Sequence, residues 1–157
     1  LNYHGLQARF KKTNFILYGS VDDIWLDTKN NYLILVDYKS QANEKEVSQE
    51  TYWGGDFKTG YQTQLDFYFY LLKQQNFKET ISDDAYLLVV NARGLDEIFD
   101  KKLLFESTLI HTKVKDDYLE NEIQDMIEVF NSHNIPESNK LCKNCAYARQ
   151  RSIIDKL

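Results

Sequence analysis

The sequence predicts an α/β (α+β) fold in which a mixed central β-sheet is flanked by helices. Apolar segments follow one another in the order strand, strand, helix, strand, strand, helix, after a possible earlier strand around Leu6 to Lys11. The strands and helices do not alternate regularly, as a doubly wound parallel sheet requires. The sequence also has no glycine-rich phosphate loop of either common kind. Nucleotide-binding folds are therefore disfavoured.

The first clear elements form a β-hairpin. Residues Phe15 to Leu26 are rich in β-branched, aromatic and aliphatic side chains, which favours a strand. Lys29-Asn30-Asn31 supplies a turn, and Tyr32 to Lys39 supplies the second strand. Two neighbouring antiparallel strands are therefore expected.

A long polar segment separates this hairpin from the first helix. Residues Ser40 to Thr59 contain Gly54-Gly55 and show no steady hydrophobic period, which predicts a loop. Gly60 to Phe77 has no helix breaker after its first residue, and its apolar residues recur at helical spacing: Leu65, Tyr68, Phe69 and Leu72. We expect a buried helix there.

The C-terminal half predicts a central strand, a further strand or strand pair, and a helix. Ala85 to Asn91 is a continuous apolar run, which is typical of a central strand, and Lys102 to Val114 alternates in character. Asp117 is a candidate N-cap with Glu120 three residues later, ahead of an apolar helical face. That helix should end between Asn131 and Asn134.

Composition predicts one soluble domain. The 157 residues include 43% hydrophobic and 14% aromatic side chains, which is enough for a core. No segment approaches the length of a membrane span, and two cysteines cannot build a disulfide framework, so a cytoplasmic setting is the default. We expect residues 1–157 to be a single domain whose natural N-terminus lies before Leu1, because the chain does not begin with Met.

The net charge of -5 counts against tight autonomous binding of nucleic acid, which usually needs a basic surface. It counts less against a nuclease, because active-site carboxylates add negative charge that bound cations offset. Other parts of a longer protein can also supply basic surface.

Two acidic residues and a lysine stand where chemistry is expected. Side chains alternate along a strand, so Asp37 and Lys39 project from the same face at the end of an apolar run. Burying these charges is costly unless they pair or bind a metal. Asp22 brings a second carboxylate from the preceding strand, and Asp23 points to the opposite face. Such a pair of carboxylates suits Mg²⁺ or Mn²⁺, and a simple ion pair at a strand end is the structural alternative.

Gln64 and Tyr68 are four residues apart, so they share one face of the predicted helix. They can turn an amide and a phenol towards the strand ends. Taken alone, Tyr68 is more typical of a core residue, because it lies among Phe67, Phe69 and Tyr70.

Together these residues resemble the PD-(D/E)xK nuclease superfamily and, within it, the RecB-like branch that includes CRISPR-associated adaptation exonucleases and many phage nucleases. Gly19-x-x-Asp22 is similar to the first signature of that branch. Asp37-Tyr38-Lys39, after apolar Leu33 to Val36, is similar to the second, and Gln64-x-x-x-Tyr68 is similar to the third. The order, spacing and strand placement of these short motifs carry the resemblance.

The resemblance implies a restriction-endonuclease-like core and a Mg²⁺- or Mn²⁺-dependent deoxyribonuclease that hydrolyses DNA phosphodiester bonds. Asp22 and Asp37 would hold the metal, with the Tyr38 backbone carbonyl as a further ligand. Lys39 would face the scissile phosphate, and Gln64 and Tyr68 would orient water, the lysine or the DNA backbone. The implied partners are DNA and other domains or subunits of a larger nuclease complex, without a membrane.

Some features depart from the RecB-like pattern. Asp37 stands where many members of that branch have Glu, and the acidic helix that commonly comes first is absent. Cys142-x-x-Cys145-x-Tyr147 is similar to the branch's C-terminal cysteine motif, yet an iron-sulfur cluster needs four cysteine ligands and the chain offers two. Two reduced structural cysteines are therefore favoured, unless a preceding segment supplies further ligands.

The alternative function is a catalytically inactive module that keeps the nuclease fold to bind DNA or protein inside a larger repair, recombination or phage protein. The acidic balance of the chain favours this alternative. The residues leave open whether DNA or RNA is cut, and whether cleavage begins at ends or internally.

Overall fold

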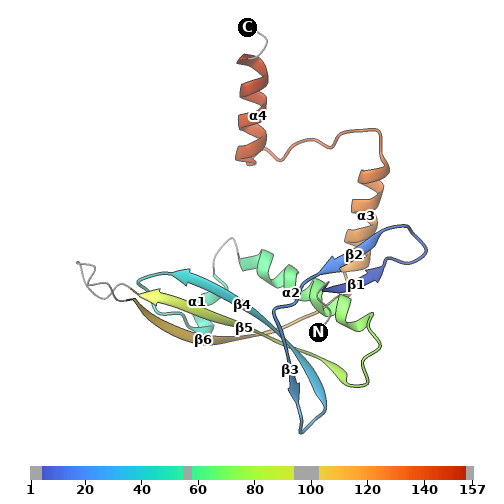
Figure 1. Ribbon diagram of the computed structural model, residues 1–157. Helices are drawn as coiled ribbons and strands as arrows, with labels where there is room; N and C mark the ends of the chain where they lie inside the picture. Colours follow the sequence, from blue (N-terminus) through green and yellow to red (C-terminus); the bar gives the residue numbers. More distant parts are fainter. Residues whose placement is uncertain (1–4, 55–57, 94–102, 155–157) are drawn as a thin grey trace. The chain divides into compact units, whose positions relative to one another are not determined.

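The computed structural model describes residues 5–54, 58–93 and 103–154. The chain divides into two compact units, Leu1–Leu119 and Glu120–Leu157. The first unit holds every described strand, and the second holds the C-terminal helices (Figure 1). The single domain expected over residues 1–157 stays a prediction. None of the helices in the described ranges combines the length and the apolar character that a membrane span needs.

The first unit is built on a four-stranded mixed sheet with the order β3-β4-β5-β6 (Figure 1). β3 (Asp23–Asp27) pairs antiparallel with β4 (Tyr32–Ala42), and β4 pairs parallel with β5 (Thr80–Arg93). β5 in turn pairs antiparallel with β6 (Leu104–Lys113). Parallel strands need a crossover connection, and α2 (Lys58–Lys73) lies in it. The predicted fold class, a mixed sheet flanked by helices, is confirmed.

A separate antiparallel hairpin of β1 (Leu6–Arg9) and β2 (Ile16–Gly19) contacts α2. The prediction of one strand from Phe15 to Leu26 is wrong, because the chain leaves this hairpin after Gly19 and enters the four-stranded sheet at Asp23. Apolar composition continues across the break, so it does not reveal the change of sheet. The earlier strand expected around Leu6 is present as β1.

The core lies between α2 and one face of the sheet. Residues from three strands and the helix are fully buried in it: Leu35, Leu87, Ile110, Leu65 and Leu72. On the opposite face of β4, Tyr38 is 47% exposed. The predicted alternation along β4 is therefore confirmed, with the site residues on the core side.

The predicted turn between β3 and β4 is also confirmed. The Asp27 carboxylate accepts hydrogen bonds from the backbone N–H groups of Lys29 at 2.9 Å and Asn30 at 3.2 Å. Asn31 has a φ of 58°, in the left-handed region that Asn tolerates better than most residues. This turn fixes the register of the two strands that carry the acidic residues.

The segment predicted as a loop from Ser40 to Thr59 contains regular structure. β4 continues to Ala42, because its last residues pair with β5, and α1 (Gln49–Tyr52) follows. The Gln49 side-chain amide donates to the carbonyl of His111 at 2.9 Å and accepts from its N–H at 2.8 Å. A side chain thereby pairs with backbone groups of the edge strand β6.

The other predicted boundaries shift without changing the order of elements. The helix expected from Gly60 to Phe77 runs from Lys58 to Lys73. The strand expected at Ala85–Asn91 extends in both directions to Thr80 and Arg93, and Lys102–Val114 gives the single strand β6. Strand pairing with neighbours extends these strands past the apolar runs that predicted them.

A buried carboxylate fixes α2 against the segment after β6. Asp66 is 1% exposed and accepts hydrogen bonds from Gln62 Nε2 at 2.8 Å, the Lys115 N–H at 3.1 Å and the Tyr118 hydroxyl at 2.8 Å. A buried carboxylate requires such donors. Asp66 therefore holds in place the helix that carries the third motif.

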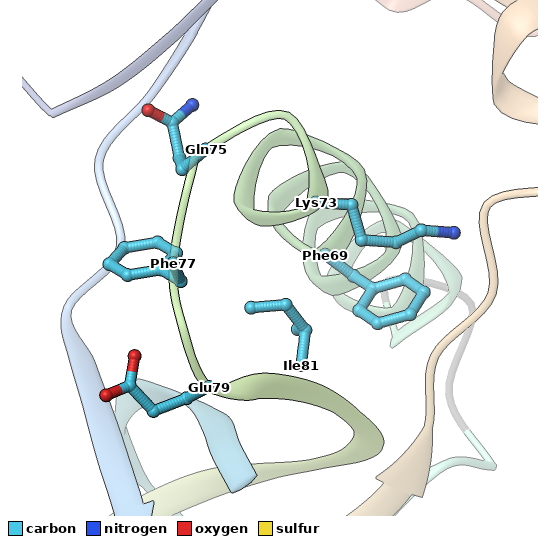
Figure 2. Close-up of a pocket in the computed structure, with 6 residues that line it drawn as sticks. All are labelled: Phe69, Lys73, Gln75, Phe77, Glu79 and Ile81. Carbon is cyan, nitrogen blue, oxygen red and sulfur yellow. The ribbon is translucent and has the colours of Figure 1, made fainter.

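A pocket of about 460 Å³ lies at the C-terminal end of α2 (Figure 2). Lys73, one of its lining residues, is ion-paired with Asp116 at 2.8 Å, and its Nζ lies 5.1 Å from the centroid of the Phe69 ring. The lysine therefore fastens the end of α2 and is not free for a ligand. None of the predicted site residues lines this pocket.

The second unit contains the predicted helix, α3 (Leu119–Asn131), which buries Ile123 and Ile127. It begins two residues after the expected N-cap Asp117. A further helix, α4 (Lys143–Ile154), was not predicted, because its apolar residues are weakly segregated to one face and none of them is buried.

The two cysteines lie at the start of α4 and are not bridged. The N–H of Cys145 donates to the sulfur of Cys142 at 3.3 Å. Hydrogen bonding from Cys145 lowers the pKa of the Cys142 thiol. Their assignment as reduced structural cysteines stays a prediction.

Candidate active site

Asp37 and Lys39 lie together on the core side of β4. Asp37 is 1% exposed, and Lys39 Nζ lies 2.5 Å from its Oδ2. Beyond this ion pair, Oδ2 has no hydrogen-bond partner within the described ranges. Lys39 balances the negative charge of Asp37, yet Asp37 Oδ2 is buried and still has lone pairs that accept no hydrogen bond. Such an oxygen is suited to a metal ion.

The register of the sheet brings Asp22 next to Asp37. Asp23 pairs with Val36, so Asp22 lies across from Asp37 just beyond the end of β3. Asp22 Oδ2 accepts a hydrogen bond from the Tyr38 N–H at 2.8 Å, which turns its carboxylate towards β4. The two carboxylates therefore approach each other, as the first and second motifs predict.

The pKa of Asp37 reflects this crowded environment. Burial is the main cause that raises its pKa above the ordinary value; Lys39 opposes the rise, and the nearby Asp22 carboxylate adds to it. A cation placed between two such carboxylates relieves both the desolvation and the repulsion.

Asp23 points away from this site, as the sequence predicts. Its carboxylate accepts hydrogen bonds from the Tyr38 hydroxyl at 2.5 Å and from Trp25 Nε1 at 3.0 Å. The hydrogen bond from Tyr38 is the main cause that lowers the pKa of Asp23. The Tyr38 side chain is therefore on the outer face of β4, and only the backbone of Tyr38 can contribute a group to the site.

The third motif meets the second through Gln64. Its Oε1 accepts from Lys39 Nζ at 2.9 Å, and its Nε2 donates to the Tyr68 hydroxyl at 2.9 Å and to Asp37 Oδ1 at 3.4 Å. An ammonium only donates and a carboxylate only accepts, so these partners fix the orientation of the amide. Tyr68 also packs against the core, which agrees with its interpretation as a core residue, and its role in the site stays a prediction.

Gly19 allows the first motif to approach the third. A Cβ at this position would lie 2.8 Å from Leu71 Cδ1 and 2.9 Å from Tyr68 Cε1. We expect Gly19→Ala to destabilise the protein by about 1–3 kcal/mol, because α2 must shift to accept the methyl group. Urea denaturation measures this change.

Gly60→Ala is the matched control for Gly19→Ala. A Cβ at Gly60 meets nothing within 4 Å, so this substitution in α2 should leave the free energy of unfolding unchanged or raise it by up to about 1 kcal/mol. Equal stabilities for the two variants would show that the approach of Gly19 to α2 is not required.

Sequence reasoning missed Tyr61 and Lys58. The centroid of the Tyr61 ring lies 4.6 Å from Lys39 Nζ and 5.4 Å from Lys58 Nζ. Tyr61 precedes Gln64 by three residues, so helical spacing puts both on one face of α2. This helical spacing could have identified Tyr61 as a site residue from the sequence, whereas no comparable pattern marks Lys58.

The donor set fits a hard divalent cation. Asp22 and Asp37 offer carboxylate oxygens, which Mg²⁺ and Mn²⁺ prefer. Within the described ranges, no group of three or more His, Cys, Asp or Glu side chains that could hold a metal is present. A cation here would therefore take its other oxygens from backbone, water or substrate, which is the usual manner of Mg²⁺.

Comparison with known proteins gives one match. A model of the PD-(D/E)XK nuclease superfamily matches residues 2–150, a range that includes all three motifs. Neither the curated proteins nor the solved structures gave a match. Members of this superfamily are generally hydrolytic nucleases and typically use divalent metals. The restriction-endonuclease-like fold agrees with the match. The chain therefore belongs to the PD-(D/E)XK nuclease superfamily.

Proposed function

We propose that this protein is a Mg²⁺- or Mn²⁺-dependent deoxyribonuclease of the RecB-like branch, which hydrolyses phosphodiester bonds of DNA. The convergence of three motifs at one point carries the proposal. Asp22 approaches Asp37 from the neighbouring strand, and Gln64 joins Asp37, Lys39 and Tyr68 through hydrogen bonds. Superfamily membership supports hydrolysis of nucleic acid as the reaction class.

Asp22 and Asp37 would hold the cation, with the Tyr38 backbone carbonyl as a further oxygen ligand. When bound, such a cation stabilises negative charge on phosphoryl oxygens and lowers the pKa of water. The hydrogen bond from the Tyr38 N–H already orients the Asp22 carboxylate, so this ligand needs little rearrangement.

Lys39 is the residue that would face the scissile phosphate. Three partners fix its ammonium: Asp37 at 2.5 Å, Gln64 at 2.9 Å and the Tyr61 ring at 4.6 Å to its centroid. A charge that is fixed in advance stabilises the growing negative charge of the transition state without paying for reorganisation. The ammonium can also hold the attacking water by a hydrogen bond.

Gln64 and Tyr68 act as positioning residues in this mechanism. Gln64 binds Lys39 through its carbonyl oxygen, so its amide sets the direction of the lysine. The Tyr68 hydroxyl accepts a hydrogen bond from Gln64, which leaves its own proton to be donated to water or to a phosphate oxygen.

A DNA degradation assay tests the proposed function. Wild-type protein should degrade DNA with Mg²⁺ or Mn²⁺, and EDTA should stop the reaction. Asp37→Asn should also abolish it, because the buried metal ligand loses its charge. Asp83→Asn is the matched control, since Asp83 is exposed and paired with Lys113 outside the site. Degradation that persists with EDTA or in Asp37→Asn would reject the proposal.

A catalytically inactive module, which binds DNA or protein in a larger repair, recombination or phage protein, is the second candidate function. The net charge of -5 is compatible with such a module in a larger protein, and it favours a protein partner over DNA, because tight binding of DNA usually needs a basic surface. Calorimetric titration with Mn²⁺ separates the two functions. Binding that Asp22→Asn removes supports the enzyme, and absence of binding supports the module.

A further inference from the structure

A second pocket, of about 350 Å³, lies beside the candidate active site. It is formed by the end of β4, the segment after it, α1 and the start of α2. The residues that matter for its chemistry are Gln41, Asn43, Lys45, Glu46, Tyr52 and Lys58. The formal charges of Lys45 and Glu46 cancel, so Lys58 gives the pocket lining its net positive charge.

The Tyr61 ring contacts both the catalytic lysine and Lys58 of the pocket. The ring is approached by Lys39 Nζ, at 4.6 Å from the centroid, and by Lys58 Nζ, at 5.4 Å. Burial first, then Tyr61 and Asp37, raise the pKa of the pocket residue Tyr52 to about 12. Through the Tyr61 ring, the lining of this pocket is linked to Lys39 of the candidate site.

Lys58 carries a positive charge that no carboxylate within the described ranges neutralises. Its Nζ lies 3.4 Å from the centroid of the Tyr52 ring, and it forms no ion pair with any residue in the described ranges. Partial burial lowers its pKa. A partly desolvated ammonium that lies on aromatic rings and has no ion-paired carboxylate among the described residues is stabilised by an incoming anion.

A buried amide holds the wall of the pocket in place. Asn91 is 1% exposed, and its side chain exchanges two hydrogen bonds with the backbone of Asn43, both at 3.0 Å. It also donates to the carbonyl of Lys45 at 3.4 Å. The wall is therefore formed before any ligand arrives, which lowers the cost of binding.

We infer that this pocket is a DNA subsite in which Lys58 binds the phosphate next to the scissile one. The inference rests on the proposed nuclease function, because Lys39 defines where the scissile phosphate lies. A DNA strand presents phosphates in regular succession, and Lys58 offers a second ammonium against the same tyrosine ring that Lys39 approaches. Phosphate contacts carry no sequence information, so Lys58 sets affinity and strand position and not base preference.

Lys58→Ala tests the subsite, with Lys29→Ala as the matched control in the exposed turn between β3 and β4. We expect Lys58→Ala to raise KM for DNA by about tenfold with little change in kcat. For DNA oligonucleotides bound in EDTA, the slope of log affinity against log salt should fall by about one unit, equally for different base sequences. Lys58→Arg retains the charge and should keep a slope close to the wild-type value.

The outcomes separate this inference from the function on which it rests. If wild-type protein cleaves DNA but Lys58→Ala matches Lys29→Ala in KM and salt slope, the subsite is overturned and the nuclease stands. A fall in kcat alone also overturns it, because Lys58 would then act in the chemistry. If wild-type protein does not cleave DNA with either metal, the proposed function itself fails. Thermal denaturation of each variant identifies a folding defect. If Lys58→Ala does not fold, the salt slope of Lys58→Arg decides: a slope close to the wild-type value supports the subsite, and a slope lower by about one unit overturns it.

Discussion

Lys39→Ala is expected to lower kcat for DNA cleavage by about 100- to 1000-fold, the usual effect of removing one fixed donor to a developing anion. The ammonium is held by the side chains of Asp37 and Gln64, so its position does not depend on substrate. Steady-state kinetics at saturating metal measure the loss. Lys39→Arg should recover only part of it, because a guanidinium does not have the geometry of an ammonium.

The affinity for metal provides the control for this prediction. Removing Lys39 takes away a cation that competes for Asp37, so Mn²⁺ should bind Lys39→Ala at least as tightly as wild-type protein. Calorimetric titration measures that affinity. A variant that has lost Mn²⁺ binding together with activity would place Lys39 in the structure of the metal site and not in the chemistry.

The second large effect is expected in the stability of the metal-free protein. Lys39→Ala leaves the Asp37 carboxylate buried without its partner, which should cost about 3–5 kcal/mol of unfolding free energy. Adding Asp37→Asn to this variant should recover most of the loss, because the buried charge is then gone. Urea denaturation in EDTA of the two single variants and the double variant gives the coupling energy directly.

The pH dependence of the same variants has a definite sign. The folded-state pKa of Asp37 is raised, mainly by burial, and Lys39 is the group that limits the rise. A carboxyl whose folded-state pKa exceeds its unfolded-state pKa does not change the free energy of unfolding at a pH below both values. As the pH rises through the interval between the two pKa values, this carboxyl destabilises the fold. Metal-free Lys39→Ala should therefore gain stability relative to wild type as pH falls towards the unfolded pKa. A difference that does not change with pH would show that Asp37 is not the cause.

The site was largely predictable because its residues lie on regular elements. Strand alternation put Asp37 and Lys39 on one face, and helical spacing put Gln64 and Tyr68 on one face; the structure joins these four residues by hydrogen bonds and an ion pair. These local periods depend on the backbone alone. The catalytic and metal-binding roles of the residues stay predictions.

The parts that were not predictable depend on contacts between distant segments. The break between β2 and β3 coincides with the close approach of Gly19 to α2, a contact between distant segments that no local pattern contains. The buried side chains of Asp66 and Asn91 have partners as far as 52 residues away in sequence, so their role appears only when the chain has folded. Polar residues of this kind look like surface residues in a sequence.

The amide of Gln49 also bears on self-association. An exposed edge strand can recruit a strand from another molecule, which is a common route to aggregation. At His111 both backbone groups are already taken by Gln49, and the Thr108 hydroxyl binds the carbonyl of Val47 nearby. The segment from Val47 to Gln49, which is not a strand, thus covers part of the exposed edge of β6. It should discourage copies of this protein from joining edge to edge.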